Sequence, residues 1–193
     1  GYWLQKDALR PIPIRTATDT RGSCRSSLAR TDTIGNTMTA PLHRSAAPLL
    51  LTGFDPFGGS TLNPSWLVAR ALHGQRIAGH AVVAEQLPTV FGAAQAQLHA
   101  LLQAHRPALV LCLGQAGGRA ALSIERIAIN VADARIPDNQ GAQPVDEPVV
   151  PGAPAAYFAT LPVKALHRAV QQAGLPCEVS QTAGTFVCNA VFY

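Results

Sequence analysis

Cys188 begins a short apolar segment at the C-terminal end of the sequence. An apolar run over 175–179 precedes a Ser/Thr/Gly turn, and the apolar segment starts directly after that turn. If this segment is helical, Cys188 lies in its first turn, where unpaired backbone N–H groups and the helix dipole favour a thiolate over a thiol. We therefore interpret Cys188 as a candidate nucleophile. The alternative is a buried, inert cysteine that packs as a small hydrophobic residue.

Glu125 is the carboxylate whose surroundings are most unusual in the sequence. Residues 122–130 read as one strand, and strand alternation would place Glu125 on the same face as Ile127 and Ile129. A carboxylate on an apolar face either faces a crevice at the strand end or is buried with a partner. The alternative to a functional acid is a salt bridge to Arg119, Arg126 or Arg135.

Phe54 and Phe57 stand three residues apart in a loop that is rich in glycine, residues 53–59. Aromatic side chains at this spacing are commonly core residues. Flanking glycines indicate a loop at the surface, however, where two aromatic rings can form the walls of a site for a flat, apolar ligand. Both interpretations stay open from the sequence.

The elements that must position these residues alternate between strand and helix. Apolar runs predict strands at 49–53, 81–87, 108–113, 122–130 and 177–179, and helical spacing predicts helices at 64–74, 90–105 and 161–174. This alternation predicts an α/β fold, a three-layer α/β/α sandwich around a largely parallel or mixed sheet of the phosphorylase/hydrolase-like kind.

Loops beyond the strand ends of such a sheet gather into one crevice. We expect four loops to line it: 53–59, 88–89, 114–118 and the turn before Cys188. A further connection, residues 131–155, is longer than a compact domain usually tolerates without a purpose.

Charge is distributed unevenly along the 193 residues, whose net charge is +4. Residues 1–47 hold seven Lys/Arg and three Asp, a balance of +4, whereas residues 48–193 hold eight charges of each sign. The neutral body gives no reason to expect a nucleic-acid partner, and its apolar runs are too short to cross a membrane.

Residues 1–47 are rich in Arg, Thr, Ser and Pro and lack apolar periodicity. We expect a disordered or non-native N-terminal extension here, with translation starting at Met38, or alternatively an organelle transit peptide. The domain would then span residues 48–193.

The four cysteines have neither zinc-site spacing nor a disulfide-framework pattern, and Cys112 and Cys177 are expected to be reduced core residues of a cytoplasmic protein. No metal or organic cofactor is expected, because the glycine-rich segments match neither phosphate-binding nor dinucleotide-binding spacing. A nucleoside phosphorylase-like enzyme is a weaker interpretation, since the body has no clustered basic loop for phosphate.

Taken together, the motifs resemble those of the pyroglutamyl peptidase I family of cysteine peptidases over residues 48–193. The matching segments are Thr52–Gly59, Asn63–Ser65, Gly114–Gly117, Ser123–Asn130, Asp133–Asn139 and Ser180–Asn189. The resemblance implies a cysteine-type omega peptidase that removes N-terminal pyroglutamyl residues from peptides through an acyl-enzyme. It also implies a homo-oligomer, often a tetramer.

By the same resemblance, Cys188 is the nucleophile and Glu125 the acid of a Cys-His-Glu triad. The residues that match the lining of the pyroglutamyl pocket are Phe54, Phe57, Thr89, Ile136, Phe186 and Val187, and Gln115 matches a position close to the ring.

The histidine of that triad follows the cysteine in the family, whereas this sequence ends five residues after Cys188. None of the six histidines present is assigned as the base; His167, for example, is expected on the outward face of its helix. We expect a C-terminally truncated domain, either a fragment of a longer product or an inactive relative that retains a pyroglutamyl-binding pocket.

Overall fold

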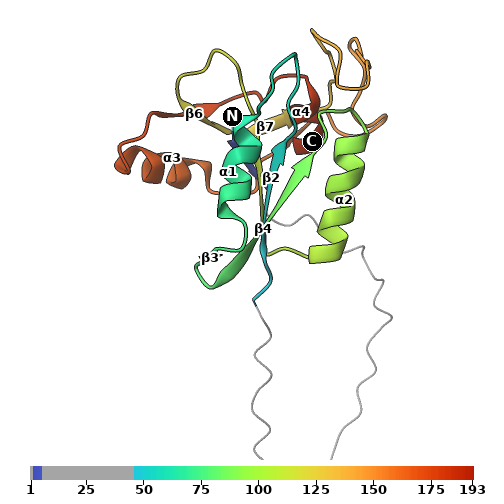
Figure 1. Cartoon of the computed structure of the whole chain (residues 1–193). Helices are drawn as coiled ribbons and strands as arrows, with labels where there is room; N and C mark the ends of the chain where they lie inside the picture. The colour runs from blue at the N-terminus through green and yellow to red at the C-terminus, as the bar shows by residue number, and fades with distance from the viewer. Residues whose placement is uncertain (1, 6–45) are drawn as a thin grey trace, which may run out of the picture. The chain divides into compact units, whose positions relative to one another are not determined.

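The structure, a computed structural model, describes residues 2–5 and 46–193 (Figure 1). Its main sheet has the strand order β3-β4-β2-β5-β1-β6-β9. These strands are β1 (Tyr2–Gln5), β2 (Leu49–Phe54), β3 (Arg76–Ile77), β4 (His80–Leu87), β5 (Leu109–Leu113), β6 (Leu122–Glu125) and β9 (Cys177–Ser180). The helices are α1 (Pro64–Leu72), α2 (Ala93–His105), α3 (Val163–Gln172) and α4 (Val187–Phe192).

Strand directions within this sheet are mixed. β2 runs parallel to both β4 and β5, and β6 runs parallel to β9. β3 pairs antiparallel with β4, and β1 lies between β5 and β6, antiparallel to the first and parallel to the second. The predicted mixed sheet is therefore confirmed.

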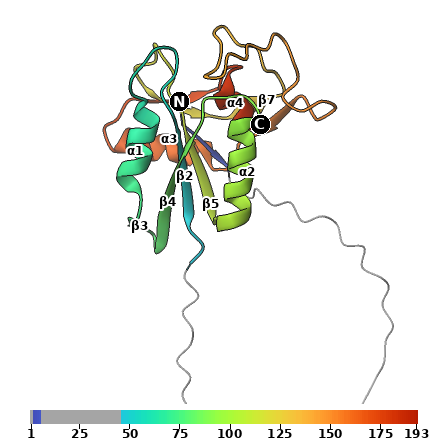
Figure 2. The ribbon, with the colours of Figure 1, turned by 45° about the vertical axis from the view of Figure 1, so that its right-hand side comes forward.

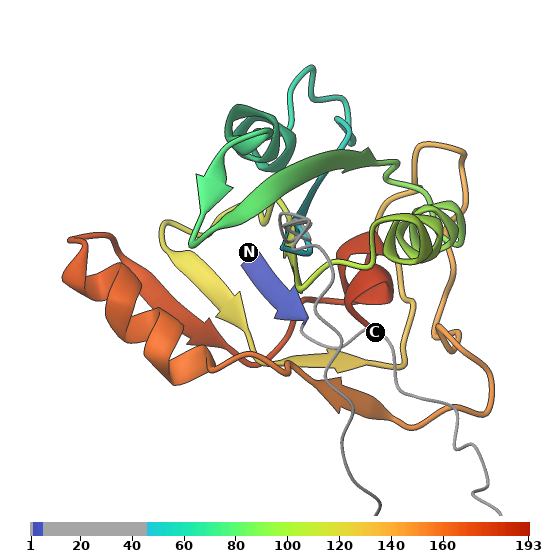
Figure 3. The ribbon, with the colours of Figure 1, turned by 90° about the horizontal axis from the view of Figure 1, so that it is seen from below.

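Successive residues of β2 point to opposite faces of the sheet and show which helix covers which face. Leu50 packs in a cluster with Leu98 of α2 and with α4, whereas Leu51 packs with Ala69 of α1. The ribbon accordingly has α1 on one side of β2 and β4 and α2 on the other (Figures 2 and 3). Helix, sheet and helix form three layers, as predicted.

Helix α1 begins where the sequence predicts. Asn63 is the N-cap, its side chain accepts a hydrogen bond from the Ser65 N–H at 3.1 Å, and Pro64 occupies the first helical position. The next predicted helix is α2, which starts at Ala93 rather than 90. Helix α3 follows, contacts β9 and β6, and has no buried residue.

The single strand predicted over residues 122–130 is wrong. It breaks at Arg126 into β6, which pairs with β9, and β7 (Ile127–Ile129), which pairs with β8 (Ala156–Phe158) in a second, two-stranded sheet. Because the chain changes sheets there, the expected alternation does not continue past Arg126: Ile127 and Ile129 are half-buried, and the buried residue of β7 is Ala128. The short strand β8 was not predicted.

The expectation of an unstructured N-terminal extension differs from the structure at Tyr2–Gln5, which form β1. Aromatic and aliphatic residue types such as these favour strands when an unpaired strand edge is available. Residues 6–45, including Met38, lie outside the described part of the chain, so for them the expectation stays a prediction. The long connection over residues 131–155 is confirmed; within it only Ala132 and Glu147 form an isolated bridge.

Among the described helices, none combines the length and the apolar character that spanning a bilayer requires.

Candidate active site

A cavity of about 440 Å³ lies where β2, β4 and β5 end, and all four loops expected at the crevice contribute to it. Eight of the nine residues singled out from the sequence line this cavity: Phe54, Phe57, Thr89, Gln115, Glu125, Ile136, Phe186 and Cys188. The candidate nucleophile and the candidate acid therefore open onto one space, although they are 63 positions apart in the sequence.

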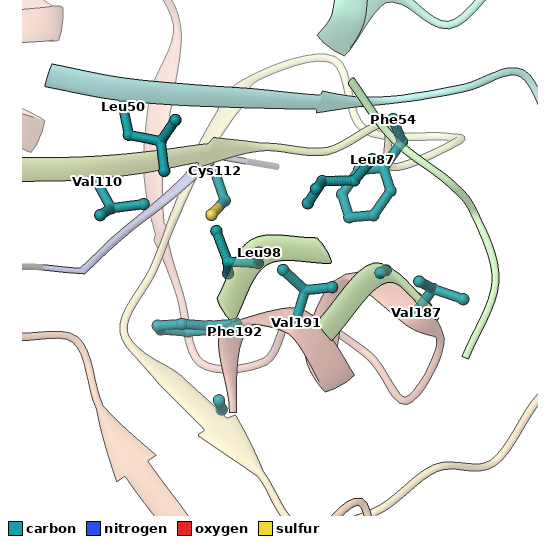
Figure 4. Close-up of a cluster of buried hydrophobic side chains, with 11 residues drawn as sticks. Leu50, Phe54, Leu87, Leu98, Val110, Cys112, Val187, Val191 and Phe192 are labelled. Carbon is teal, nitrogen blue, oxygen red and sulfur yellow. The ribbon is translucent and has the colours of Figure 1, made fainter. Parts of the chain in front are cut away.

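Val187 is the exception, and its assignment to the pocket lining is corrected. Its side chain is fully buried in the hydrophobic cluster that contains Phe54, Leu87 and Val191 (Figure 4). Successive side chains around the start of a helix diverge by about 100°. Phe186 and Cys188 consequently line the cavity, while Val187 enters the core.

Aromatic rings form one side of the cavity. Phe186 lies between Phe57, with ring centroids 5.9 Å apart, and Phe91, whose ring meets it edge-on at 5.4 Å. Phe54 is 1% exposed and belongs to the core cluster while also lining the cavity, so both interpretations of this residue hold together. We refer to Phe54, Phe57 and Phe186 as the aromatic wall. Its shape suits a flat ligand with little charge.

Hydrogen bonds from two other loops hold the loop that carries Phe54 and Phe57. The Asp55 carboxylate accepts from the Thr89 N–H at 2.6 Å and from the Asn139 side-chain amide at 3.2 Å. The same amide donates to the Pro56 carbonyl oxygen at 2.8 Å. Three loops that are distant in sequence are thereby fixed to one another at the cavity.

The other support of this loop is the start of α1. The Phe54 N–H donates to the Ser65 hydroxyl at 3.0 Å, and the Asn63 amide donates to the Asp55 carbonyl oxygen at 2.9 Å. Gly53 permits this approach, because a Cβ atom there would lie 2.5 Å from the Trp66 backbone nitrogen. Only glycine can occupy that position without displacing the helix.

Glu125 is 2% exposed and forms an ion pair with Arg119, whose Nη1 donates to Oε1 at 2.8 Å. Its other oxygen, Oε2, is buried without a hydrogen-bond partner among the described residues. Burial raises the pKa of the Glu125 carboxyl above its ordinary value, while the nearby Ser180 hydroxyl and the Arg119 cation oppose that rise. The two alternatives drawn from the sequence are thus combined, since Glu125 faces the cavity and is also salt-bridged.

Cys188 is the second residue of α4 and is half-buried, so its predicted place in a first helical turn is confirmed. The expectation of a thiolate at Cys188 is not confirmed, because burial raises the pKa of this thiol to about 12. Loss of hydration outweighs the weak dipole of a helix that has six residues. At neutral pH this sulfur carries its proton until a base accepts it.

Several polar residues line the cavity that were not predicted as site residues: Asn63, Asp133, Arg135 and Thr185. Asp133 is tied to the turn before Cys188 by its N–H, which donates to the Thr185 carbonyl oxygen at 3.0 Å, and by the Thr185 hydroxyl, which donates to the Asp133 carbonyl oxygen at 2.6 Å. The segment from Asp133 to Asn139 could have indicated Asp133 and Arg135 as site residues, because charged residues flank Ile136 there.

None of the five histidines in the described part of the chain lines the cavity. His167, expected to point outward from α3, is half-buried, and its Nε2 lies 3.0 Å from the Cys177 carbonyl oxygen. His73 accepts a hydrogen bond at Nδ1 from the Ala84 N–H. Both rings are engaged by the backbone away from the site.

Within residues 46–193, no group of three or more His, Cys, Asp or Glu side chains is arranged to hold a metal ion. Cys112, Cys177 and Cys188 are free thiols; Cys112 is buried as expected, whereas Cys177 is half-buried at the start of β9 and is not the core residue that was expected.

Comparison with known proteins agrees with this arrangement. Residues 47–193 match the family described as pyroglutamyl peptidase. The chain belongs to that family. The pyrrolidone-carboxylate peptidase of Gloeobacter violaceus is 62% identical over 145 residues, which cover 75% of this chain and 71% of that protein. That of Cupriavidus necator is 61% identical and covers 75% of this chain and 67% of its own length.

Solved structures of the family share the fold. Pyroglutamyl peptidase I of Bacillus amyloliquefaciens superposes with a TM-score of 0.74 at 50% identity, over 76% of this chain and 71% of that one. Pyrrolidone carboxyl peptidase of Pyrococcus furiosus gives a TM-score of 0.74 at 46% identity, over 76% and 70%. These similarities leave no reason to pursue the nucleoside phosphorylase-like interpretation.

Proposed function

We propose that this chain is a cysteine peptidase that hydrolyses N-terminal pyroglutamyl residues from peptides. The observation that carries the proposal is that Cys188 and Glu125 open onto one cavity with an aromatic wall. Membership of the pyroglutamyl peptidase family supports the same activity.

The pyroglutamyl ring is a flat, uncharged lactam, and the side chains that line the cavity suit such a ligand. The aromatic wall and Ile136 supply apolar surface against the faces and edge of the ring. The lactam also carries an N–H donor. Gln115 Oε1 is a buried acceptor without a hydrogen-bond partner among the described residues, and a donor entering the cavity would satisfy it.

The reaction would proceed by acyl transfer. Cys188 Sγ attacks the carbonyl carbon that joins pyroglutamate to the next residue, a C–S bond forms, and the C–N bond breaks as the leaving amine takes up a proton. Water then attacks the thioester, which releases pyroglutamate and restores the thiol. Because burial raises the pKa of the Cys188 thiol to about 12, a base must accept its proton before the attack.

Glu125 would orient that base through its unpartnered oxygen Oε2. In the triad that the resemblance implies, the base is an imidazole. The described histidines lie outside the cavity, so we assign this role to none of them.

A second candidate function is binding of the pyroglutamyl ring without turnover. The aromatic wall and Gln115 Oε1, which has no partner among the described residues, support this alternative as well, because neither feature needs a deprotonated thiol. Both functions use the same aromatic wall, and they differ only in whether the thiol is deprotonated.

Two measurements on the 193-residue chain test these functions. Hydrolysis of a pyroglutamyl coumarin amide that disappears in Cys188→Ser supports the peptidase. Absence of hydrolysis, combined with slower iodoacetamide labelling of Cys188 in the presence of 2-pyrrolidone, supports binding alone. Cys112 serves as the internal reference, because it is 2% exposed and should label more slowly than Cys188. Neither hydrolysis nor protection would contradict both functions.

We also propose that the chain acts as a homo-oligomer, a tetramer by the family resemblance, and works in the cytoplasm. Large apolar side chains such as Val145 and Phe158, which are 71% and 68% exposed, support a surface that another copy covers. Free thiols at Cys112 and Cys177 support a reducing compartment. Sedimentation equilibrium that finds a monomer at all concentrations would contradict the oligomer.

A further inference from the structure

Arg119 is a cation in the loop between β5 and β6, and neither the family resemblance nor the proposed reaction gives it a role. Its side chain is 32% exposed, and it lines the same cavity as Glu125 and Cys188. The guanidinium contacts Glu125, 6 positions away in the sequence, and Ser180 and Thr182, which are 61 and 63 positions away. It therefore connects parts of the site that the backbone alone does not join.

The first contact is the ion pair with Glu125, at 2.8 Å from Nη1 to Oε1. The others are to the Ser180 hydroxyl, at 3.3 Å from Nη1, and to the Thr182 carbonyl oxygen, at 3.3 Å from Nη2. Two nitrogens of one planar fork are thus used at once, a geometry that a lysine ammonium cannot reproduce.

These contacts tie together the ends of two neighbouring strands. Glu125 ends β6 and pairs in register with Ser180, which ends β9. The turn that follows Ser180 leads to Cys188 at the start of α4. Arg119 therefore links the candidate acid to the backbone segment that places the candidate nucleophile.

The ion pair also decides which carboxylate oxygen is available. Oε1 is occupied by Arg119, whereas Oε2 has no partner among the described residues. With Oε1 paired to Arg119, Oε2 is the carboxylate oxygen whose lone pairs have no donor among the described residues. Without Arg119, Glu125 would be a buried, uncompensated charge that could rotate or take up a proton.

We infer that Arg119 is the positioning residue of this site: its guanidinium holds Oε1 of Glu125, anchors it to the turn before Cys188 and leaves Oε2 to orient the base. The inference rests on the proposed peptidase function, and it adds a residue that acts through Glu125. The other titratable or charged side chains around Glu125 are Asp133, Arg135 and Cys188, which line the cavity, and Glu178 on β9, which accepts from the Ser123 hydroxyl.

The test compares Arg119→Gln and Arg119→Lys with Arg168→Gln, a matched loss of charge on the exposed side of α3. The titration of Glu125 is followed by carboxyl ¹³C NMR and is assigned with Glu125→Gln. We expect Arg119→Gln to raise the pKa of Glu125 by about one unit or more, because an opposite charge at this distance lowers a carboxyl pKa by about 1–3 units. Arg168→Gln should leave the titration where it is in the wild type.

Measurements of kcat and KM distinguish a positioning role of Arg119 from a role in stability alone. In Arg119→Gln, the acid limb of the kcat profile should move upward by the same amount as the Glu125 titration, with KM changed by less than about twofold. Arg119→Lys should restore the Glu125 titration but only part of kcat, because it keeps the charge and loses the fork. If Arg119→Gln does not fold, Arg119→Lys carries the test: a kcat equal to that of the wild type, with an unchanged Glu125 titration, would show that the fork is not needed and would overturn the inference.

A Glu125 titration that is the same in Arg119→Gln and the wild type would overturn the inference. So would an acid limb that stays in place while the titration moves. If the wild type hydrolyses no pyroglutamyl amide, the proposed function fails. The inference is then decided separately, by the Glu125 titration and by the pH dependence of Cys188 labelling in the same variants.

Discussion

The two sides of the cavity are held by different interactions. Phe54 and Phe57 of the aromatic wall stand on a loop held by hydrogen bonds that involve Asp55, Asn63 and Asn139, and two of these are amide-to-carbonyl bonds that do not depend on pH. The acidic side depends on the Arg119–Glu125 ion pair, in which a carboxylate that is 2% exposed has one oxygen paired and one oxygen unpartnered.

This difference indicates a division of tasks. A wall that has to recognise an uncharged ring gains from rigidity, because a preformed site does not have to be ordered when the ligand binds. A group that has to orient a proton acceptor must keep a free lone pair and a charge that responds to its surroundings. Substitutions on the aromatic side should therefore change folding and affinity, while those on the acidic side should change pH dependence.

The largest effect is expected at Cys188, where the two sides meet. Cys188→Ala should lower the hydrolysis of a pyroglutamyl amide by at least about 10³-fold, because no covalent step remains. The affinity for 2-pyrrolidone, measured by calorimetry, should stay within about twofold, since the aromatic wall is untouched. Cys177→Ala, at a half-buried position on β9, is the control. Loss of ring binding in Cys188→Ala would show that the two sides are not separable.

Gly53→Ala should disrupt the aromatic side of the cavity, because the added Cβ collides with the backbone of α1. The added Cβ would lie 2.5 Å from the Trp66 nitrogen and 2.6 Å from the Ser65 carbonyl carbon, so helix α1 would have to move. We expect a loss of about 3 kcal/mol in the free energy of unfolding, measured in urea.

Gly117→Ala is the matched control for this experiment, because a Cβ there meets no atom within 4 Å. A change within about 0.5 kcal/mol is expected for it. Equal stability of the two variants would contradict the close approach of β2 to α1.

Phe57→Ala should weaken the aromatic wall without unfolding it. The side chain is half-buried and contacts Phe186. The affinity for 2-pyrrolidone should fall by about tenfold or more, since apolar surface against the ring is lost. Phe158→Ala, at a residue that is 68% exposed and outside the cavity, should leave the affinity unchanged. An unchanged affinity in Phe57→Ala would remove this residue from the binding site.

The smallest effect concerns the acidic side. Because the folded protein raises the pKa of Glu125 above the ordinary value of 4.5, it holds this proton more tightly than the unfolded chain does. The Glu125 contribution to stability is therefore complete below the unfolded pKa and is lost as pH rises through the folded pKa. Denaturant unfolding at several pH values across this window should show a decline with pH that Glu125→Gln reduces. Superimposable profiles would contradict the buried carboxylate.

Local residue chemistry was sufficient to predict much of this molecule. The apolar run of β2, the Asn63-Pro64 start of α1 and the glycines of the loop after β2 each specify their own conformation, because caps, prolines and glycines act within a few residues. The four loops around the cavity followed from the α/β pattern, since such sheets gather their loops at the strand ends.

Other features depended on contacts that the sequence does not display. The continuous pattern of residues 122–130 conceals the break at Arg126, which the pairing of β6 with β9 and of β7 with β8 produces. Asn189 of α4 stabilises β7: its side chain accepts a hydrogen bond from the Ile129 N–H and donates one to the Ile129 carbonyl oxygen. The place of Val187 also depended on tertiary structure, because the rotation of the short helix α4 decides which of the residues 186–188 enters the core.

By itself, the sequence determined the fold class, the family and the residue types that stand around the cavity, because these depend on local pattern and motif. The tertiary structure alone decided the ionisation of the site. The pKa of Cys188 rises to about 12 through burial, and that of Glu125 is set by burial against Arg119 and Ser180. Electrostatic energies depend on hydration and on distances between groups far apart in the chain, which only the folded arrangement fixes.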